Sequence, residues 1–326
     1  MIQLAKKLSY FALAVLALVV PFAWIEMRAS NFMMKSDAFK LAKGVDGLIV
    51  GDSHAESSLD PAMIPGTINI ARANELLFYT YYKMRYFLEM NPGAIHKVIL
   101  AFSYHNIGKN AGYYFIEPPY SNMHLESYYL YLDKTGKEKV SSCRNYRLYS
   151  IKREYGFPLM AYRDQHVFDY ICNGSVDKSH IPGYGGFKSL VGSNLDLWRA
   201  QASVSRYLSD NNETYAGYVE VMINALDRIA SLCAEKNIKL YLYNSPLHVI
   251  YRRLIPIADR ERYENAVKTI KGGYGNVVPV DMSCYPLEDA LFYNGNHVNH
   301  LGAVIVSRAV ARLVRTGLSR SRAGGT

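Results

Sequence analysis

Short uninterrupted runs of apolar residues alternate along the chain with longer stretches of mixed polarity. The first run after the N-terminal region, Gly47–Val50, ends at Gly51, and an apolar run bounded by glycines is typical of a buried parallel strand. Later runs of apolar and β-branched residues end on turn or polar residues and predict further strands over 67–71, 98–102, 238–243 and 277–281.

Between these runs, apolar residues recur at three- and four-residue spacing and predict helices over 74–90, 218–236, 259–271 and 301–315. One helical face, for example, is formed by Val219, Met222, Ile223, Leu226, Ile229, Ala230 and Cys233. Strands that alternate with amphipathic helices predict an α/β fold with a doubly wound parallel sheet. The carboxyl ends of the strands in such a sheet form the crevice where ligands bind.

The N-terminal region predicts a membrane anchor. Lys6 and Lys7 precede a run from Leu8 to Ile25 without a charged side chain, long enough for a membrane-spanning helix of roughly 18 to 20 residues. No small-x-small cleavage site follows this run, which favours an anchor over 1–30 rather than a cleaved signal peptide. The paired lysines place the N-terminus in the cytoplasm, and everything after a tether over 31–45 outside the inner membrane. Four basic residues beyond the run weaken this charge asymmetry: Arg28, Lys35, Lys40 and Lys43.

The region over 107–210 interrupts the strand and helix rhythm and is rich in tyrosine. We interpret it as an insertion in an α/β domain that spans 46–318, folded against the crevice. Tyrosine combines a flat apolar face with a polar tip, which suits a surface where sugar rings dock. The alternative is a second structural lobe packed by aromatic side chains. The basic, glycine-containing residues 319–326 predict a disordered tail.

Composition narrows the classes of partner. The net charge of +9 favours an anionic environment such as lipid headgroups or an acidic glycan. No zinc-finger, RNP or helix-turn-helix signature accompanies the basic residues, so nucleic acid is not an expected partner. The four cysteines show no C-x-x-C pairing, which argues against a structural zinc site. In an oxidising compartment Cys143 and Cys172 could form a disulfide.

Two loops carry candidate chemistry. Ser53 follows the first predicted strand within Gly51-Asp52-Ser53-His54, where the hydroxyl at a strand-to-helix turn is exposed and nearby amides can face an oxyanion. A serine hydroxyl needs a base, and His297 lies between the last predicted strand and the last helix, in a loop that should open onto the same crevice. Each residue also has a structural interpretation, as part of a helix cap or as a solvated loop side chain.

Together, Gly51-Asp52-Ser53-His54 after the first strand and the H-x-N-x-x-G-A motif that starts at His297 resemble the SGNH (GDSL-like) hydrolase superfamily. Within it, the chain resembles the membrane-anchored DltD-like and alginate-acetylation-like proteins of bacterial envelope polysaccharide systems. The resemblance covers the order of elements from about 46 to 315, apart from the insertion, and is specific only at the two motifs.

The resemblance implies that Ser53 is the nucleophile and His297 its general base. The acid of the family stands three residues before that histidine, and this position holds Asn294. An amide can orient an imidazole by accepting a hydrogen bond, but it cannot stabilise imidazolium as a carboxylate does. Either Asn294 orients a slower serine-histidine pair, or a nearby carboxylate substitutes, or the enzyme is degraded. The candidate carboxylates are Glu288, Asp289 and Asp281.

The family's oxyanion hole implies three donors here. These are the backbone N–H of Ser53, the N–H of Ala71 at a position that is usually glycine, and the side chain of Asn106 after the third strand. Ser103 is an alternative to Asn106. No cofactor and no metal is expected.

The sequence thus predicts an extracytoplasmic serine esterase or O-acyltransferase, with O-acetyl as the expected group, that acts on an envelope or exopolysaccharide glycan. The family adds a polytopic membrane acyltransferase as a candidate partner. Two alternatives stay open. One is a non-catalytic scaffold protein of a polysaccharide system. The other is a metal-dependent phosphoesterase, since Asp52-x-His54 and Gly295-Asn296-His297 match parts of its motifs and His297-x-x-His300 could chelate.

Overall fold

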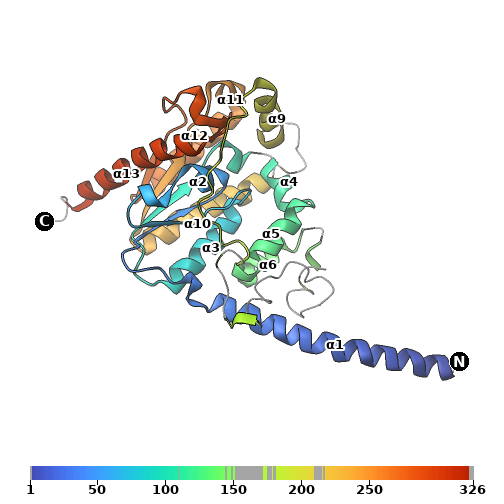
Figure 1. Cartoon of the computed structure of the whole chain (residues 1–326). Helices are drawn as coiled ribbons and strands as arrows, with labels where there is room; N and C mark the ends of the chain where they lie inside the picture. Colours follow the sequence, from blue (N-terminus) through green and yellow to red (C-terminus); the bar gives the residue numbers. More distant parts are fainter. Residues whose placement is uncertain are drawn as a thin grey trace. The chain divides into compact units, whose positions relative to one another are not determined.

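A computed structural model describes residues 2–108, 110–143, 145–147, 150, 172–174, 178, 181–208, 215 and 217–322. The chain divides into two compact units, each built from two separate segments (Figure 1). One unit combines Leu41–Ile116 with Gly183–Thr326 and contains a parallel sheet. The other combines Met1–Lys40 with Glu117–Pro182.

Five parallel strands form the main sheet. They are β1 (Gly47–Val50), β2 (Thr67–Asn69), β3 (Lys97–Ala101), β4 (Lys239–Asn244) and β5 (Val277–Asp281), in the order β2-β1-β3-β4-β5. Leu48 pairs with Val98, and Val98 with Leu240, so the register is continuous across the three central strands. This order is that of flavodoxin-like doubly wound sheets. The prediction of an α/β fold with a parallel sheet is confirmed.

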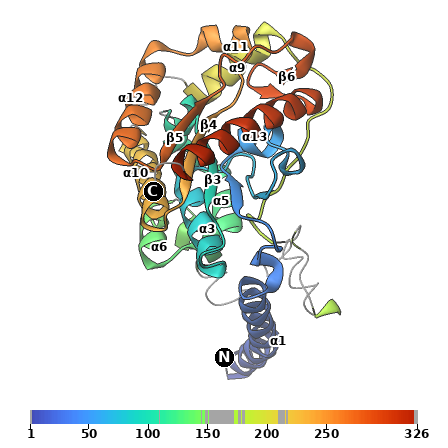
Figure 2. The same ribbon diagram turned by 90° about the vertical axis from the view of Figure 1, so that its left-hand side faces the viewer.

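Helices cover both faces of this sheet (Figure 2). On one face lie α2 (Ser53–Ser58) and α13 (His300–Arg322), which contact each other. On the other, α10 (Gly217–Glu235) packs between α3 (Leu77–Met90) and α12 (Ile257–Gly273). The sheet and the helices on its two faces therefore make three layers. The edge formed by the carboxyl ends of the strands is left free for loops.

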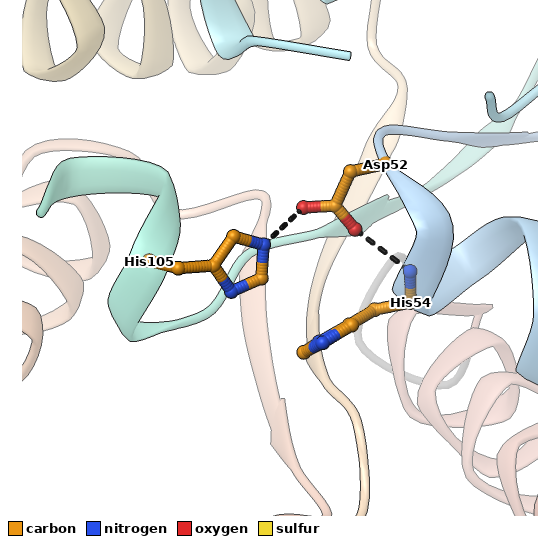
Figure 3. Close-up of side chains that lie close together, drawn as sticks. All are labelled: Asp52, His54 and His105. Carbon is orange, nitrogen blue, oxygen red and sulfur yellow. Dashed lines mark hydrogen bonds and ion pairs between the residues drawn. The ribbon is translucent and has the colours of Figure 1, made fainter. Parts of the chain in front are cut away.

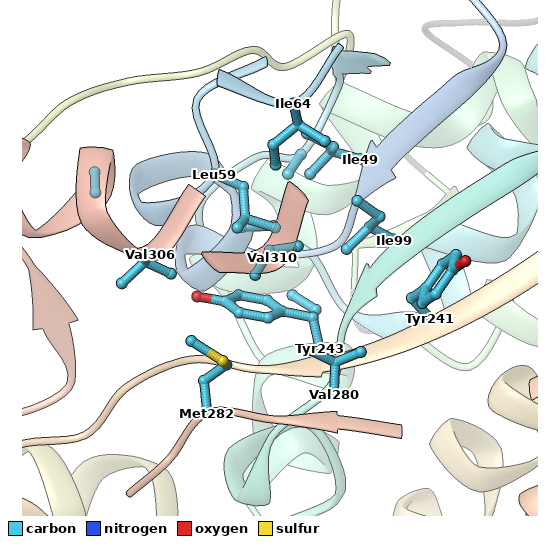
Figure 4. Packing of buried hydrophobic residues seen from close by; sticks show 14 of the residues in the cluster. Ile49, Leu59, Ile64, Ile99, Tyr241, Tyr243, Val280, Met282, Val306 and Val310 are labelled. Carbon is cyan, nitrogen blue, oxygen red and sulfur yellow. The ribbon is translucent and has the colours of Figure 1, made fainter. Parts of the chain in front are cut away.

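The strand residues that face α13 are apolar because they form a buried core with that helix. Ile49, Ile99 and Tyr243 point to one side of the sheet and pack with Val306 and Val310 of α13 (Figure 4). All five are fully buried. Because alternate residues of a strand face opposite sides, the remaining strand residues are buried under the helices of the other face. The sheet is thus a rigid platform for the loops at its edge.

Shorter elements of the same unit lie in the loops. They include the antiparallel hairpin of β6 (Phe292–Asn294) and β7 (His297–Val298), and the helices α4 (Asn110–Ile116), α9 (Leu197–Leu208) and α11 (Val249–Leu254). Single 3-10 turns occur at η2 (Pro61–Met63), η3 (Tyr104–Ile107) and η8 (Asp289–Leu291).

The other unit is helical in its described residues. It contains α1 (Ile2–Met34), η1 (Asp37–Phe39), α5 (Tyr120–Tyr128), η4 (Tyr129–Tyr131) and α6 (Lys134–Val140). Within α1, Gln3–Pro21 is long and apolar enough to cross a membrane or to act as a signal anchor. The predicted insertion over 107–210 is divided between the units, since 117–182 belongs here and 183–208 belongs with the sheet.

Two predicted boundaries differ from the structure. Helix α1 continues to Met34, into the predicted tether, because no glycine or proline interrupts 22–34 and Ala29 and Met33 are buried. Helix α13 continues to Arg322, so 319–322 of the predicted tail is helical, while 323–326 lies outside the described residues. Cys143 is buried, Cys172 is exposed, and both are free thiols in this structure.

Candidate active site

The two predicted loops meet at the carboxyl edge of the sheet. Strand β1 ends at Val50, and Gly51 then turns the chain with a φ of 115°, a conformation that favours glycine. A side chain there would also lie 2.8 Å from the Cβ of Ala101 on the neighbouring strand. Ser53 consequently starts α2 directly above the sheet edge. The Oγ of Ser53 lies 2.9 Å from Nε2 of His297, although 244 residues separate them.

The ring of His297 is oriented by two asparagines. Its Nδ1 lies 3.1 Å from Oδ1 of Asn294 and 3.1 Å from Oδ1 of Asn296. Both oxygens can only accept, so Nδ1 carries the hydrogen and Nε2 is the atom that can accept from the serine hydroxyl. Asn294 Oδ1 also accepts from the backbone N–H of Asn296 and of His297, which fixes the tight turn of the hairpin.

None of the three alternative carboxylates shares a hydrogen bond with His297, all four residues being described. Asp289 accepts from Nε2 of His248 at 2.9 Å, and Asp281 accepts from Asn244 and from the backbone N–H of Ser283. Glu288 is exposed at the start of η8. The position that orients the imidazole is therefore held by Asn294, with Asn296 as a second acceptor that the sequence motif did not single out.

Electrostatics keep His297 neutral. Its burial lowers the pKa to about 4, against an ordinary value of 6.5. The negative charge of Asp52 raises this pKa and His105 lowers it, but both effects are smaller than that of burial. A neutral imidazole with a free lone pair on Nε2 is the form that a general base requires.

Asp52 is a buried carboxylate beside the pair (Figure 3). Its Oδ1 accepts from the backbone N–H of His54 at 2.9 Å and so caps α2. Its Oδ2 accepts from Nε2 of His105 at 2.7 Å and from Nδ2 of Asn106 at 2.6 Å. Burial raises the pKa of Asp52, but His105, His54 and the hydrogen bond from Asn106 together hold it well below its ordinary range. A permanent negative charge therefore lies under the candidate site.

His54 is the most enclosed member of the group. Its side chain is 2% exposed, and its ring meets those of His105 and His297 edge to face, with centroids 4.6 Å and 5.0 Å apart. Burial lowers its pKa well below the usual value, and His105 lowers it further. Neither ring nitrogen has a hydrogen-bond partner in the part of the chain described.

The structure brings only part of the predicted oxyanion hole together. Asn106 lines the pocket beside Ser53, and one N–H of its amide donates to Asp52. Ala71 does not line the pocket, and its N–H donates to Oδ1 of Asn69 at 2.9 Å. This hydrogen bond does not fit the role predicted for Ala71. Asn74 lines the pocket from the same loop instead, with a φ of 61°.

A small pocket of about 50 Å³ opens over these groups. Its polar side is formed by the residues around Ser53 and His297, and its apolar side by Leu76, Ala111, Tyr114 and Tyr207. Two tyrosines of the region rich in that residue thus line the pocket. His54 lies in the first turn of α2 and His105 in η3, and the pairing of β1 with β3 brings these two elements together. His300 is exposed at the start of α13, whereas Nε2 of His297 lies against Oγ of Ser53.

Comparison with solved structures returns, among its matches, one described as a "putative platelet activating factor from Streptococcus pneumonia". The sequence identity is 12%, the TM-score is 0.42, and the alignment covers 93% of this chain and 98% of the other. At this TM-score the similarity supports no conclusion about activity. No protein-family model and no curated protein matches the chain. The class is therefore defined by fold and site alone, as an α/β protein with a serine-histidine pair at the carboxyl edge of a parallel sheet.

Proposed function

We propose that the chain is a serine-dependent ester-processing enzyme of the SGNH type, in which Ser53 carries the acyl group and His297 is the base. The observation that supports this most directly is the 2.9 Å contact between Oγ of Ser53 and Nε2 of His297. This separation lies within the hydrogen-bond range of about 2.6–3.2 Å that proton transfer to a base requires. The contact joins the segment after β1 to the hairpin of β6 and β7, and both segments lie at the carboxyl edge of the parallel sheet.

In the proposed reaction, Nε2 of His297 takes the hydroxyl proton while Oγ of Ser53 attacks the carbonyl carbon of an ester. The tetrahedral intermediate collapses when the C–O bond to the leaving alcohol breaks, and His297 returns its proton to that oxygen. The acyl group then stays on Ser53. Water or a sugar hydroxyl repeats these steps in reverse, giving the free acid or a new ester. Hydrolysis and transfer use the same residues.

The imidazolium formed in each step needs compensating charge. Asn294 and Asn296 accept the Nδ1 hydrogen but are neutral. Asp52 raises the pKa of His297, which means that its charge favours the protonated ring. We therefore assign to Asp52 part of the role that a carboxylate at position 294 has in related enzymes.

The developing oxyanion needs donors next to Ser53. The Ser53 N–H at the start of α2 and the second N–H of the Asn106 amide are the candidates that line the pocket. Asn74 replaces Ala71 as the residue that the second loop presents to this space. A small acyl group such as acetyl is the one we propose, since the pocket over Ser53 is small.

The acceptor we propose is an envelope or exopolysaccharide glycan outside the cytoplasmic membrane. The apolar span Gln3–Pro21 supports anchorage, and the net charge of +9 supports an anionic surface or polymer. Tyr114 and Tyr207 line the pocket and stack on each other, and tyrosine is a residue type suited to contact with sugars. A polytopic membrane acyltransferase would be the donor in a transfer reaction. Recovery of the chain in the soluble fraction after cell lysis would contradict the anchor.

The test is turnover of a 4-nitrophenyl acetate ester by the full chain in detergent. Ser53→Ala should abolish turnover, and His297→Ala should reduce kcat by about 10² to 10⁴. Ser193→Ala, at an exposed position outside the pocket, is the matched control and should retain full turnover. Equal turnover in Ser53→Ala and the parent chain would exclude the proposed nucleophile.

A further inference from the structure

Three potential metal ligands converge beneath the pocket. Asp52, His54 and His105 each offer one ligand atom, and these atoms all lie within 4.8 Å of one another (Figure 3). Asp52 and His54 come from the loop after β1, and His105 from the loop after β3. Because β1 and β3 are neighbours in the sheet, the fold itself holds these two loops together.

The enclosed His54 is the second observation that points to a ligand. A buried polar atom without a partner costs roughly 1 to 3 kcal/mol, so such atoms are rare unless they have a function. Within the described chain, neither ring nitrogen of His54 has a hydrogen-bond partner. The side chain is 2% exposed and lines the pocket. A neutral imidazole nitrogen with no hydrogen-bond partner has a lone pair ready for a metal ion.

Asp52 can bind a cation and still keep its other hydrogen bonds. The backbone N–H of His54 would remain on Oδ1, and the amide of Asn106 would remain on Oδ2. Only the 2.7 Å contact between Oδ2 and Nε2 of His105 would change, since a metal would lie between these two atoms. The Asn106 amide would then hold the ligating carboxylate in place, as an outer hydrogen-bond partner does in known metal sites.

We propose that Asp52, His54 and His105 form a binding site for a divalent transition-metal ion of the zinc type, with water from the pocket as fourth ligand. Two imidazoles and one carboxylate match zinc better than magnesium or calcium, which prefer oxygen ligands. Zinc bonds of about 2.0–2.2 Å place tetrahedral ligands roughly 3.3 Å apart. A rotation of the histidine side chains brings the cluster from its present spacing to this one.

The consequence, which rests on the proposed function, is inhibition of the serine-histidine pair. A bound cation would neutralise the charge of Asp52, which precedes Ser53 in the chain and lines the same pocket as Ser53 and His297. It would also fix the ring of His54, whose centroid is 5.0 Å from that of His297, and add a positive charge there. Metal binding should therefore slow acylation of Ser53 without occupying the serine itself.

The site is tested with the full chain in detergent after treatment with EDTA, by titration with cobalt(II) chloride and then zinc chloride. The expected result is one cobalt ion per chain with visible absorption bands of a four-coordinate complex, displaced by one zinc ion. His54→Phe, which fills the same volume, and His105→Gln should each weaken zinc binding at least about tenfold. His248→Gln is the matched control, because His248 is also buried and bonded to an aspartate but lies outside the cluster.

The Ser53→Ala variant separates this inference from the proposed function. It should bind cobalt and zinc as the parent chain does, whatever its turnover. Melting curves identify any variant that does not fold. If one of the two histidine variants fails to fold, the zinc affinity of the other tests the site. Zinc affinity unchanged in a folded His54→Phe or His105→Gln chain, or reduced equally in His248→Gln, would overturn the site. Zinc binding without any loss of turnover in the parent chain would overturn its inhibitory role alone.

Discussion

At the scale of single residues, the chain departs at Asn294 from the SGNH pattern that its motifs resemble. Oδ1 of Asn294 accepts from Nδ1 of His297 and from two backbone N–H groups, so the side chain orients the ring but supplies no charge. Asn294→Asp keeps the accepting oxygen and adds the charge. We expect kcat/KM for a neutral ester to rise about tenfold or more, since loss of the corresponding carboxylate in serine proteases costs about 10⁴. Unchanged or lower activity would show that position 294 does not orient the base, and Asn294→Leu should fall below the parent chain.

The pH dependence of turnover follows from the same ring. Burial lowers the pKa of His297 to about 4, and only the neutral ring can take the serine proton. Activity is therefore lost as the pH falls through about 4 and is level above it. Asp52 raises the pKa of His297 and His105 lowers it further, while His54 is neutral beside the ring. The measurement is kcat/KM against pH in EDTA, so that no metal contributes. An acidic limb near 6.5 would contradict the assignment, and Asn294→Asp should move the limb to higher pH.

Asp52→Asn removes the buried charge, and it also replaces the oxygen that accepts from His105 and Asn106 with an amide group. Asparagine caps helices as well as aspartate, and it can accept the same backbone N–H from His54. The fold of α2 should therefore be retained while the charge that favours imidazolium is lost. We expect kcat to fall about tenfold to a hundredfold, with little change in KM. Asp289→Asn, which removes the partner of His248 outside the pocket, is the control. A loss of the same size in both variants would point to stability rather than chemistry.

The sequence singled out Ser53 and His297 because each lies between a predicted strand and the helix that follows it, and such loops open at one edge of a parallel sheet. It could not identify the buried cluster, because the positions of His54 and His105 depend on side-chain packing between two loops. The pattern of apolar residues also could not predict which residue of the loop after β2 faces the pocket. Whether Ala71 or Asn74 faces the pocket is decided by the hydrogen bond from Ala71 to Asn69, which no spacing rule predicts.

At the scale of elements, the strands of the main sheet and the helices α3, α10 and α12 were predictable to within a few residues, whereas α13 continues to Arg322, past its predicted end at 315. Their signal is strong because the strands are buried on both sides and the helices have one apolar face. The hairpin of β6 and β7 was not predicted, since its strands have three and two residues and carry no alternation. Yet this hairpin places both Asn294 and His297, so the least predictable element holds the base.

A buried ion pair fixes the loop that forms another wall of the pocket. Lys83 of α3 pairs with Glu75, and its ammonium also donates to the carbonyls of Ile70 and Gly183. Both side chains are fully buried. Lys83→Met leaves the Glu75 carboxylate in the interior without its cation, and we expect a loss of about 3–5 kcal/mol in the free energy of unfolding. The double variant Lys83→Met, Glu75→Leu removes both charges and should recover most of that stability. Urea unfolding measures the free energy of unfolding of the single and the double variant. An equal loss in the two variants would contradict a role for the pair.

At the scale of the whole molecule, the alternation of strands and helices predicted an α/β unit with a parallel sheet, and the structure adds the strand order β2-β1-β3-β4-β5. The predicted insertion is divided between two units, because its last part folds with the sheet and contributes Tyr207 to the pocket. Charge and hydropathy describe a basic protein with an N-terminal helix that is long and apolar enough to cross a membrane, but they do not identify a substrate. The substrate depends on pocket contacts that involve only a few side chains.

The central claim is that one serine, activated by one histidine from the opposite end of the sequence, accepts an acyl group. The most direct measurement is labelling of the full chain with a fluorophosphonate, followed by peptide mapping of the adduct. The account predicts a single adduct on Ser53, absent in Ser53→Ala, greatly slowed in His297→Ala and unchanged in Ser193→Ala. An adduct on another residue, or labelling of Ser53 at the same rate without His297, would contradict it.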